Sequence, residues 1–196
     1  MSRSCFVPLL LAGLLPLSIE TLVRWPAATL WRLPVGDARD VSQPGAADEP
    51  AYVATRNVGG AGKHQGADLS NRQGGGEVRA AADGVVVFAG QRVPDNGYGE
   101  HVVVAHRLPE GGLVYTVYAH LAQGTVAVRA GDTVRSGERL GQVGRTGVAT
   151  SPHLHFEVRL AGDPQERWEK AKVVDPLAFV GAHQASAAAD SAQLTH

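Results

Sequence analysis

The stretch Ser151-Pro-His-Leu-His-Phe-Glu-Val158 alternates polar and apolar side chains over most of its length. Neighbouring side chains on a β-strand point to opposite faces of the sheet. His153, His155 and Glu157 would therefore share one face, and the three apolar side chains that follow each of them would pack into a core. Two imidazoles at this spacing can converge on one metal ion, although a surface strand with a polar face gives the same pattern. The stretch predicts a half-buried strand that carries a candidate metal site.

Similar short runs of β-branched and aromatic residues recur on the N-terminal side of this strand, and residues typical of turns separate them. Strong helical periodicity is missing, and the 24 glycines are scattered, as expected for many tight turns. These features predict an all-β protein, a compact antiparallel β-sheet with barrel-like or sandwich-like packing and few or no long helices apart from the N-terminal segment. The runs are Gly84–Phe88, His101–Ala105 and Leu113–Ala119, and the strand itself contributes the run His155–Leu160.

The composition argues against several classes of function. The net charge is −1 at pH 7, so no basic excess favours nucleic acid, and no polybasic stretch favours an anionic membrane surface. Cys5 is the only cysteine, so disulfides cannot stabilise the fold. Any metal ion would have to be bound by His, Asp or Glu side chains.

Composition divides the chain into four segments. The apolar run Cys5–Ser18 is shorter than the roughly 20 residues of a transmembrane helix. Residues 1–18 are therefore expected to be a signal peptide or a short membrane anchor rather than a buried helix. Residues 19–50 contain four prolines and are expected to be a linker or pro-region, either a slack tether or a segment that covers the active groove. Structured character is expected over residues 51–180, and residues 181–196, rich in Ala, Ser and Gln, are expected to be disordered.

Two further segments carry candidate functional residues. His64-Gln-Gly-Ala-Asp68 offers an imidazole and a carboxylate, which Zn²⁺ accepts together, but a charged loop in solvent would look the same. In Tyr115-Thr-Val-Tyr-Ala-His-Leu121, a regular strand would place Tyr118 and His120 on one face. This histidine could equally end a strand and bond a backbone carbonyl. Each segment alone is weak support for a site.

Together the segments match what a catalytic zinc requires. Such an ion takes three protein ligands and keeps one position open for water. His64, Asp68 and one histidine of the 153/155 pair would supply the ligands. The two remaining histidines would be available for proton transfer and transition-state stabilisation.

These three segments resemble the signature of the lysostaphin-type (LytM-like) zinc endopeptidases, and they occur in that family's order. Intervening residues match as well, and the resemblance covers about residues 55–180. The matching segments are His64-x-Gly-x-Asp68, Tyr118-Ala-His120-Leu121, His153-Leu-His155-Phe-Glu157-Val158, Ala81-Ala-Asp83-Gly84, Gly97-Tyr98-Gly99, Gly141-Gln-Val-Gly144-Arg-Thr146-Gly147 and Val173-Val-Asp175-Pro176-Leu177.

The resemblance implies a role for each residue of the site. His64, Asp68 and His155 would be the zinc ligands, and His120 and His153 the catalytic histidines beside a groove. The two histidines would assist a metal-activated water, and the sequence leaves open which of them is the general base.

Four other histidines and one acidic residue are outside this set. Glu157 is not expected to be a ligand, and it either orients a histidine or faces water. His106 is expected to be structural. His101, His183 and His196 are expected to be solvated.

The resemblance also implies the substrate and the compartment. The chain is expected to be a metalloendopeptidase that cleaves peptide crosslinks of bacterial peptidoglycan, with D-Ala–diaminopimelate favoured as the bond. It would be an exported protein of the periplasm or cell envelope. The alternative is a non-catalytic or weakly catalytic module that activates a cell-wall amidase, as some relatives do. A biotinyl or lipoyl carrier barrel is disfavoured because no Met-Lys-Met turn is present.

Overall fold

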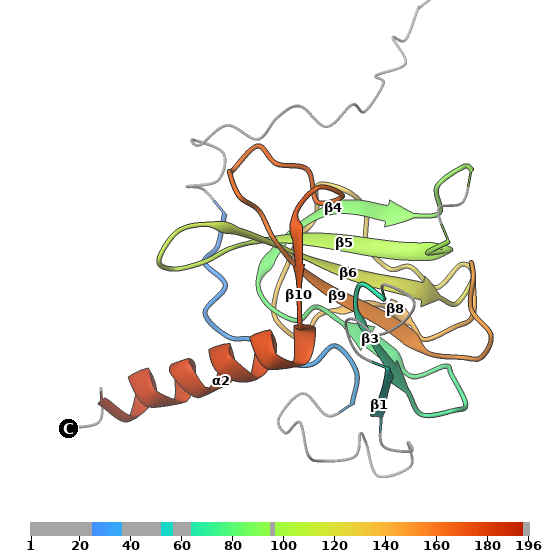
Figure 1. The fold of residues 1–196 in the computed structure, drawn as a ribbon, viewed down its shortest axis with the longest axis horizontal. Helices are drawn as coiled ribbons and strands as arrows, with labels where there is room; N and C mark the ends of the chain where they lie inside the picture. Colours follow the sequence, from blue (N-terminus) through green and yellow to red (C-terminus); the bar gives the residue numbers. More distant parts are fainter. Residues whose placement is uncertain (1–24, 37–51, 57–63, 95–96, 194–196) are drawn as a thin grey trace, which may run out of the picture.

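This computed structural model describes residues 25–36, 52–56, 64–94 and 97–193, and antiparallel strands dominate it (Figure 1). Its main sheet has eight strands in the order β1-β2-β9-β6-β5-β4-β7, with β10 beside β9, and every strand pair is antiparallel. The prediction of an all-β fold is confirmed. These strands are β1 (Val53–Arg56), β2 (Ala67–Ser70), β4 (Gly84–Gly90), β5 (Glu100–Arg107), β6 (Leu113–Leu121), β7 (Thr133–Val134), β9 (Leu154–Leu160) and β10 (Lys172–Val174). A second sheet pairs β3 (Glu77–Arg79) with β8 (Arg139–Gln142).

The central strands β5 and β6 are buried on both faces of the sheet. Every residue of β6 is buried. Val104 and Tyr118 pack into the apolar cluster on one face, and Val103 and Val117 pack into the cluster on the other. Strands covered on both sides read as continuous apolar runs instead of alternating ones. This burial explains the unbroken valines of β5.

Residues 25–36 differ from the linker that the sequence led us to expect. Ala28 and Trp31 are each only 1% exposed and belong to the apolar cluster on the Tyr118 face. The segment has no regular structure of its own, yet its backbone bonds to the domain: Ala28 N–H donates to Arg107 O and Arg32 N–H to Ala81 O, both at 2.8–2.9 Å. Such irregular docking has no period that a sequence pattern could reveal.

Helix α2 (Pro176–Gln193) begins in the expected domain and continues through residues 181–193, which were expected to be part of a disordered tail. Its start has clear signals: Asp175 Oδ1 accepts hydrogen bonds from Leu177 N–H at 2.9 Å and Ala178 N–H at 3.1 Å, and proline stands at the first helical position. Alanine, which has the highest helix propensity, fills much of the rest. Figure 1 shows the helix leaving the end of β10 and projecting away from the sheet.

The segment expected to be a signal peptide or membrane anchor, residues 1–18, lies outside the described residues. Within the described ranges, no helix combines the length and apolar character needed to cross a membrane.

Candidate metal centre

Strand pairing brings the candidate ligands together from distant parts of the chain. β2 pairs with β9 in a register that places Asp68 opposite His155. His64 lies three residues before β2, and the chain between them passes very close to β9. At Gly66, a Cβ atom would lie only 2.4 Å from the Phe156 carbonyl oxygen. The register and the missing side chain together fix how closely the two segments approach.

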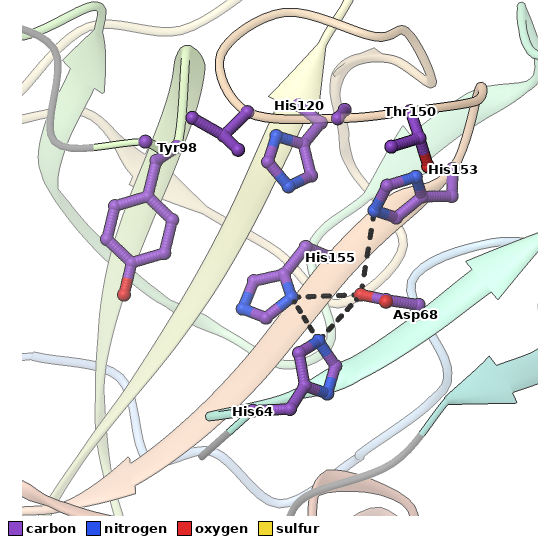
Figure 2. A pocket seen from close by; sticks show the side chains of 10 residues that line it. His64, Asp68, Tyr98, His120, Thr150, His153 and His155 are labelled. Carbon is purple, nitrogen blue, oxygen red and sulfur yellow. Dashed lines mark hydrogen bonds and ion pairs between the residues drawn. The ribbon is translucent and has the colours of Figure 1, made fainter. Parts of the chain in front are cut away.

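Three side-chain atoms converge on one point (Figure 2). His64 Nε2 lies 2.9 Å from Asp68 Oδ1 and 3.0 Å from His155 Nδ1, and His155 Nδ1 lies 3.0 Å from Asp68 Oδ1. The structure therefore brings together the three residues that were expected to be metal ligands.

The donor set and its geometry fit zinc. Two imidazole nitrogens and one carboxylate oxygen are ordinary zinc ligands, and tetrahedral bonds of about 2.0 Å separate the ligand atoms by about 3.3 Å. The observed separations are close to this value. His155 donates its Nε2–H to Glu157 Oε1 at 2.8 Å, which leaves the Nδ1 lone pair of a neutral ring for a cation.

The charges around the centre favour a cation. Burial lowers the pKa of His155, but its hydrogen bonds to Asp68 and Glu157 outweigh this effect and raise the pKa to about 9. Burial raises the pKa of Asp68, but its bond to His155 and the neighbouring imidazoles bring the pKa below its usual range. Without metal, a proton occupies the place of the cation, so a metal ion must compete with that proton.

His120 and His153 lie beside this triangle and line the same pocket. Their ring centroids are 4.8 Å apart, and His153 Nε2 lies 3.6 Å from Asp68 Oδ1. The Nδ1 atom of His120 lies 2.8 Å from Thr146 O, and that of His153 lies 2.8 Å from Ser151 O. A backbone carbonyl only accepts, so each Nδ1 carries a proton, and in the neutral form of either ring the lone pair lies on Nε2.

The backbone of His120 has an unusual conformation that directs its side chain. Its φ angle is +62°, and the β5–β6 register shifts between Glu100 and Val102. Tyr118 pairs with Phe156 and faces the core, whereas the His120 ring approaches His155. The expectation that Tyr118 and His120 share a face is therefore wrong, because this bulge turns His120 to the opposite face. Such backbone strain is common at functional sites.

The expected groove is present as a pocket of about 390 Å³ above these groups. Two loops form its rim, and glycines let them interlock: a Cβ at Gly99 or at Gly147 would lie 2.4 Å from backbone of the other loop. Burial lowers the pKa of His120 in this pocket to about 4, so its imidazole is neutral at pH 7. The residues of the rim that line the pocket are Gly97, Tyr98, Val148, Ala149 and Thr150.

The sequence did not identify two residues that surround Glu157. Tyr98 donates its hydroxyl proton to Glu157 Oε1 at 2.8 Å, and Arg159 Nε donates to Glu157 Oε2 at 2.5 Å. The period of two already contained a signal for Arg159, since it continues the face of His153, His155 and Glu157. For Tyr98, the only signal in the sequence was its position between two glycines.

The remaining histidines are placed as follows. His106 is buried, with Nδ1 2.9 Å from Asp83 O and Nε2 2.7 Å from Thr116 Oγ1, in agreement with a structural role. His101 was expected to be solvated, but it is fully buried against the Phe88 ring because β5 is covered on both faces. His183 is half-buried rather than solvated, and His196 lies outside the described residues.

Comparisons with known proteins agree with this geometry. Residues 62–167 match the model of peptidase family M23. Over 101 residues the chain is 44% identical to the DD-carboxypeptidase/endopeptidase Mpg of Neisseria gonorrhoeae, a match that covers 52% of this chain and 21% of the relative. It is 33% identical over 119 residues to the murein hydrolase activator NlpD of Salmonella typhimurium, covering 61% of this chain and 26% of the relative. The chain thus matches only a fifth to a quarter of the length of these relatives.

Among solved structures, the antimicrobial peptidase lysostaphin from Staphylococcus simulans superposes with a TM-score of 0.56 and 27% identity. The match covers 67% of this chain and 50% of lysostaphin. The fold is therefore that of the lysostaphin-type peptidases.

Proposed function

The chain belongs to peptidase family M23, and we propose that it is a zinc-dependent endopeptidase that hydrolyses peptide crosslinks of bacterial peptidoglycan. One observation carries the proposal. His64 Nε2, Asp68 Oδ1 and His155 Nδ1 lie within 3.0 Å of one another, and two further histidines line the same pocket.

The residues have distinct roles in this proposal. His64, Asp68 and His155 would hold Zn²⁺. When bound at such a site, zinc polarises a carbonyl and lowers the pKa of a coordinated water toward 7. His120 and His153 each present an Nε2 lone pair to the pocket, so either can take a proton there. The other histidine, once protonated, would stabilise the oxyanion or protonate the leaving amine.

The D-Ala–diaminopimelate crosslink is our proposed bond, which makes the activity that of a D,D-endopeptidase. The 44% identity to a protein named DD-carboxypeptidase/endopeptidase supports this choice. Because peptidoglycan lies outside the cytoplasmic membrane, the proposal includes export to the periplasm or cell envelope, with residues 1–18 as signal peptide or short anchor. Residues 51–180 would carry the peptidase activity.

The role assignments can be tested on purified variants. We expect His64→Ala and Asp68→Ala to lose bound zinc, measured by elemental analysis. His120→Ala should retain zinc and lose turnover by about 100-fold or more, the usual worth of a general acid or base. A zinc-free His120→Ala protein would refute this division of roles.

The second candidate function is activation of a cell-wall amidase, which the 33% identity to a murein hydrolase activator supports. Purified protein incubated with crosslinked muropeptide dimers separates the two functions. Mass spectrometry should show monomers cut at the D-Ala–diaminopimelate bond, and a chelator should abolish them. Hydrolysis that appears only after an amidase is added, at the amidase's own bond, would support the activator and reject the peptidase.

A further inference from the structure

Behind the metal centre lies a buried carboxylate with three hydrogen-bond donors. Glu157 is 0% exposed. Its Oε1 accepts from His155 Nε2–H and from the Tyr98 hydroxyl, both at 2.8 Å, and its Oε2 accepts from Arg159 Nε at 2.5 Å. A buried carboxylate is costly unless paired and hydrogen-bonded, and this one is both.

The Arg159 guanidinium connects the two segments that carry the metal ligands. It is 4% exposed and stands with its central carbon 5.5 Å from the Trp168 ring centre. Besides Glu157, it contacts Gln65 Oε1 at 2.5 Å and Tyr98 Oη at 3.1 Å through Nη2. Gln65 directly follows His64. One buried cation therefore holds the His155 strand and the His64 segment in a fixed relation.

These contacts determine which nitrogen of His155 can bind metal. An imidazole that donates from Nε2 keeps its lone pair on Nδ1, the atom that lies 3.0 Å from both His64 Nε2 and Asp68 Oδ1. We infer that Tyr98, Glu157 and Arg159 form a positioning group that fixes the orientation and tautomer of His155 for metal binding. This inference rests on the proposed function, because it takes zinc as the occupant of the centre.

Glu157→Gln in the full-length protein tests the inference. The amide keeps the size of the side chain but cannot accept hydrogen bonds on both sides, so the Arg159 contact or the His155 contact is lost. We expect zinc affinity, measured by competition with a chromophoric chelator, to fall by about 10- to 100-fold. The visible absorption of bound Co²⁺ should also change, which a purely structural role would not cause.

Glu169→Gln is the matched control. This carboxylate also pairs with arginines, Arg92 at 2.6 Å and Arg167 at 2.9 Å, but it makes no contact with His155. The zinc affinity and the Co²⁺ spectrum of the Glu169→Gln protein should equal those of the wild type. Thermal melting of the metal-free proteins shows whether each variant is folded.

The outcomes separate this inference from the proposed function. Wild-type affinity and spectrum in folded Glu157→Gln would overturn the positioning role while leaving the zinc peptidase intact. If Glu157→Gln does not fold, Tyr98→Phe decides, since it keeps the ring and removes the two hydrogen bonds of the hydroxyl, to Glu157 and from Arg159. We expect about 3- to 10-fold weaker zinc binding there, and unchanged binding would overturn the inference. A wild-type protein that binds no zinc would end both proposals.

Discussion

Gly66 lets the His64 segment approach the strand that carries His155. An added Cβ would lie 2.4 Å from Phe156 O and 3.0 Å from the His155 ring. Because the nearest atom is backbone, Gly66→Ala should push the two segments apart, at a cost of about 1–3 kcal/mol in unfolding free energy. Zinc affinity should fall as well, since the ligand atoms move apart. Denaturant unfolding and chelator competition measure the two effects.

Gly181→Ala is the control for this substitution. Gly181 is exposed in α2, and apart from its chain neighbours and the backbone of its own helix turn, no described atom lies within 4 Å of the added Cβ. Alanine should stabilise the helix there by about 0.8–1 kcal/mol and leave zinc affinity unchanged. Equal zinc affinity in Gly66→Ala and the wild type would show that the close approach does not matter to the centre.

His106 gives the protein a stability that depends on pH. Burial lowers its pKa to about 4, against 6.5 for an ordinary histidine. As pH falls below 6.5, histidine in the unfolded chain binds a proton before the buried His106 does, and this favours unfolding. The contribution of neutral His106 to the unfolding free energy is therefore complete above pH 6.5 and is lost toward pH 4. The contribution should fall by about 2 kcal/mol between pH 7 and pH 5.

The comparison that isolates this effect is with His106→Asn, whose amide can still donate to Asp83 O. Urea unfolding of both metal-free proteins at pH 7 and pH 5 cancels the titration of other groups. The advantage of the wild type over the variant should shrink at pH 5. A constant difference would mean that His106 does not titrate within this range.

Five side chains of the centre were predicted from the sequence because their types are rare and their motifs are specific. The alternation on β9 placed His155 and Glu157 correctly on one face. The separations of 2.9–3.0 Å among His64 Nε2, Asp68 Oδ1 and His155 Nδ1 confirm that these three side chains converge. Besides Tyr98 and Arg159, two features of the histidines were missed. Alternation cannot report a single left-handed φ angle such as that of His120. The burial of His101 depends on what covers β5, which comes from distant residues.

At the scale of elements, α2 is a helix whose start is set by its cap. Asp175 Oδ1 accepts from two of the first backbone N–H groups, which would otherwise lack a helical partner. Asp175→Ala should therefore reduce the unfolding free energy by about 1 kcal/mol. Asp175→Asn, a cap of similar quality, should retain most of the stability. Urea unfolding measures both variants. If Asp175→Asn lost as much unfolding free energy as Asp175→Ala, capping would not be the role of Asp175.

The helix also explains why composition alone misjudged the end of the chain. An Ala-rich and Ser-rich stretch has few large apolar groups, so it looked unable to order itself. Val180 and Phe179 nevertheless pack on the domain, with Phe179 4.9 Å from the Trp31 ring. A first turn anchored in this way supplies the nucleus from which good helix formers propagate.

For the whole molecule, the packed unit reaches beyond the expected boundaries of residues 51–180. Those boundaries were set by the first and last segments with the sequence pattern of a strand, and residues 25–36 show no such pattern. Trp31 nevertheless contacts His106, Phe179 and His183, with ring centroids 4.9–5.5 Å apart. It thereby joins the N-terminal segment, a central strand and the helix in one cluster, on a face of the sheet away from the pocket residues.

Removing this segment should therefore destabilise the protein without altering the centre directly. A chain that begins at residue 37 lacks Trp31, and Trp31→Ala in the full chain removes the same ring from the core. Large-to-small changes of this kind lower the unfolding free energy by about 3–5 kcal/mol. A chain that begins at residue 25 keeps Trp31 and should melt well above both of these proteins. Zinc should still bind wherever the domain remains folded, because no residue of 25–36 lines the pocket. An unchanged melting temperature after removal of residues 1–36 would mean that residues 25–36 contact the sheet without stabilising it. The expected boundary at residue 51 would then describe the stable domain.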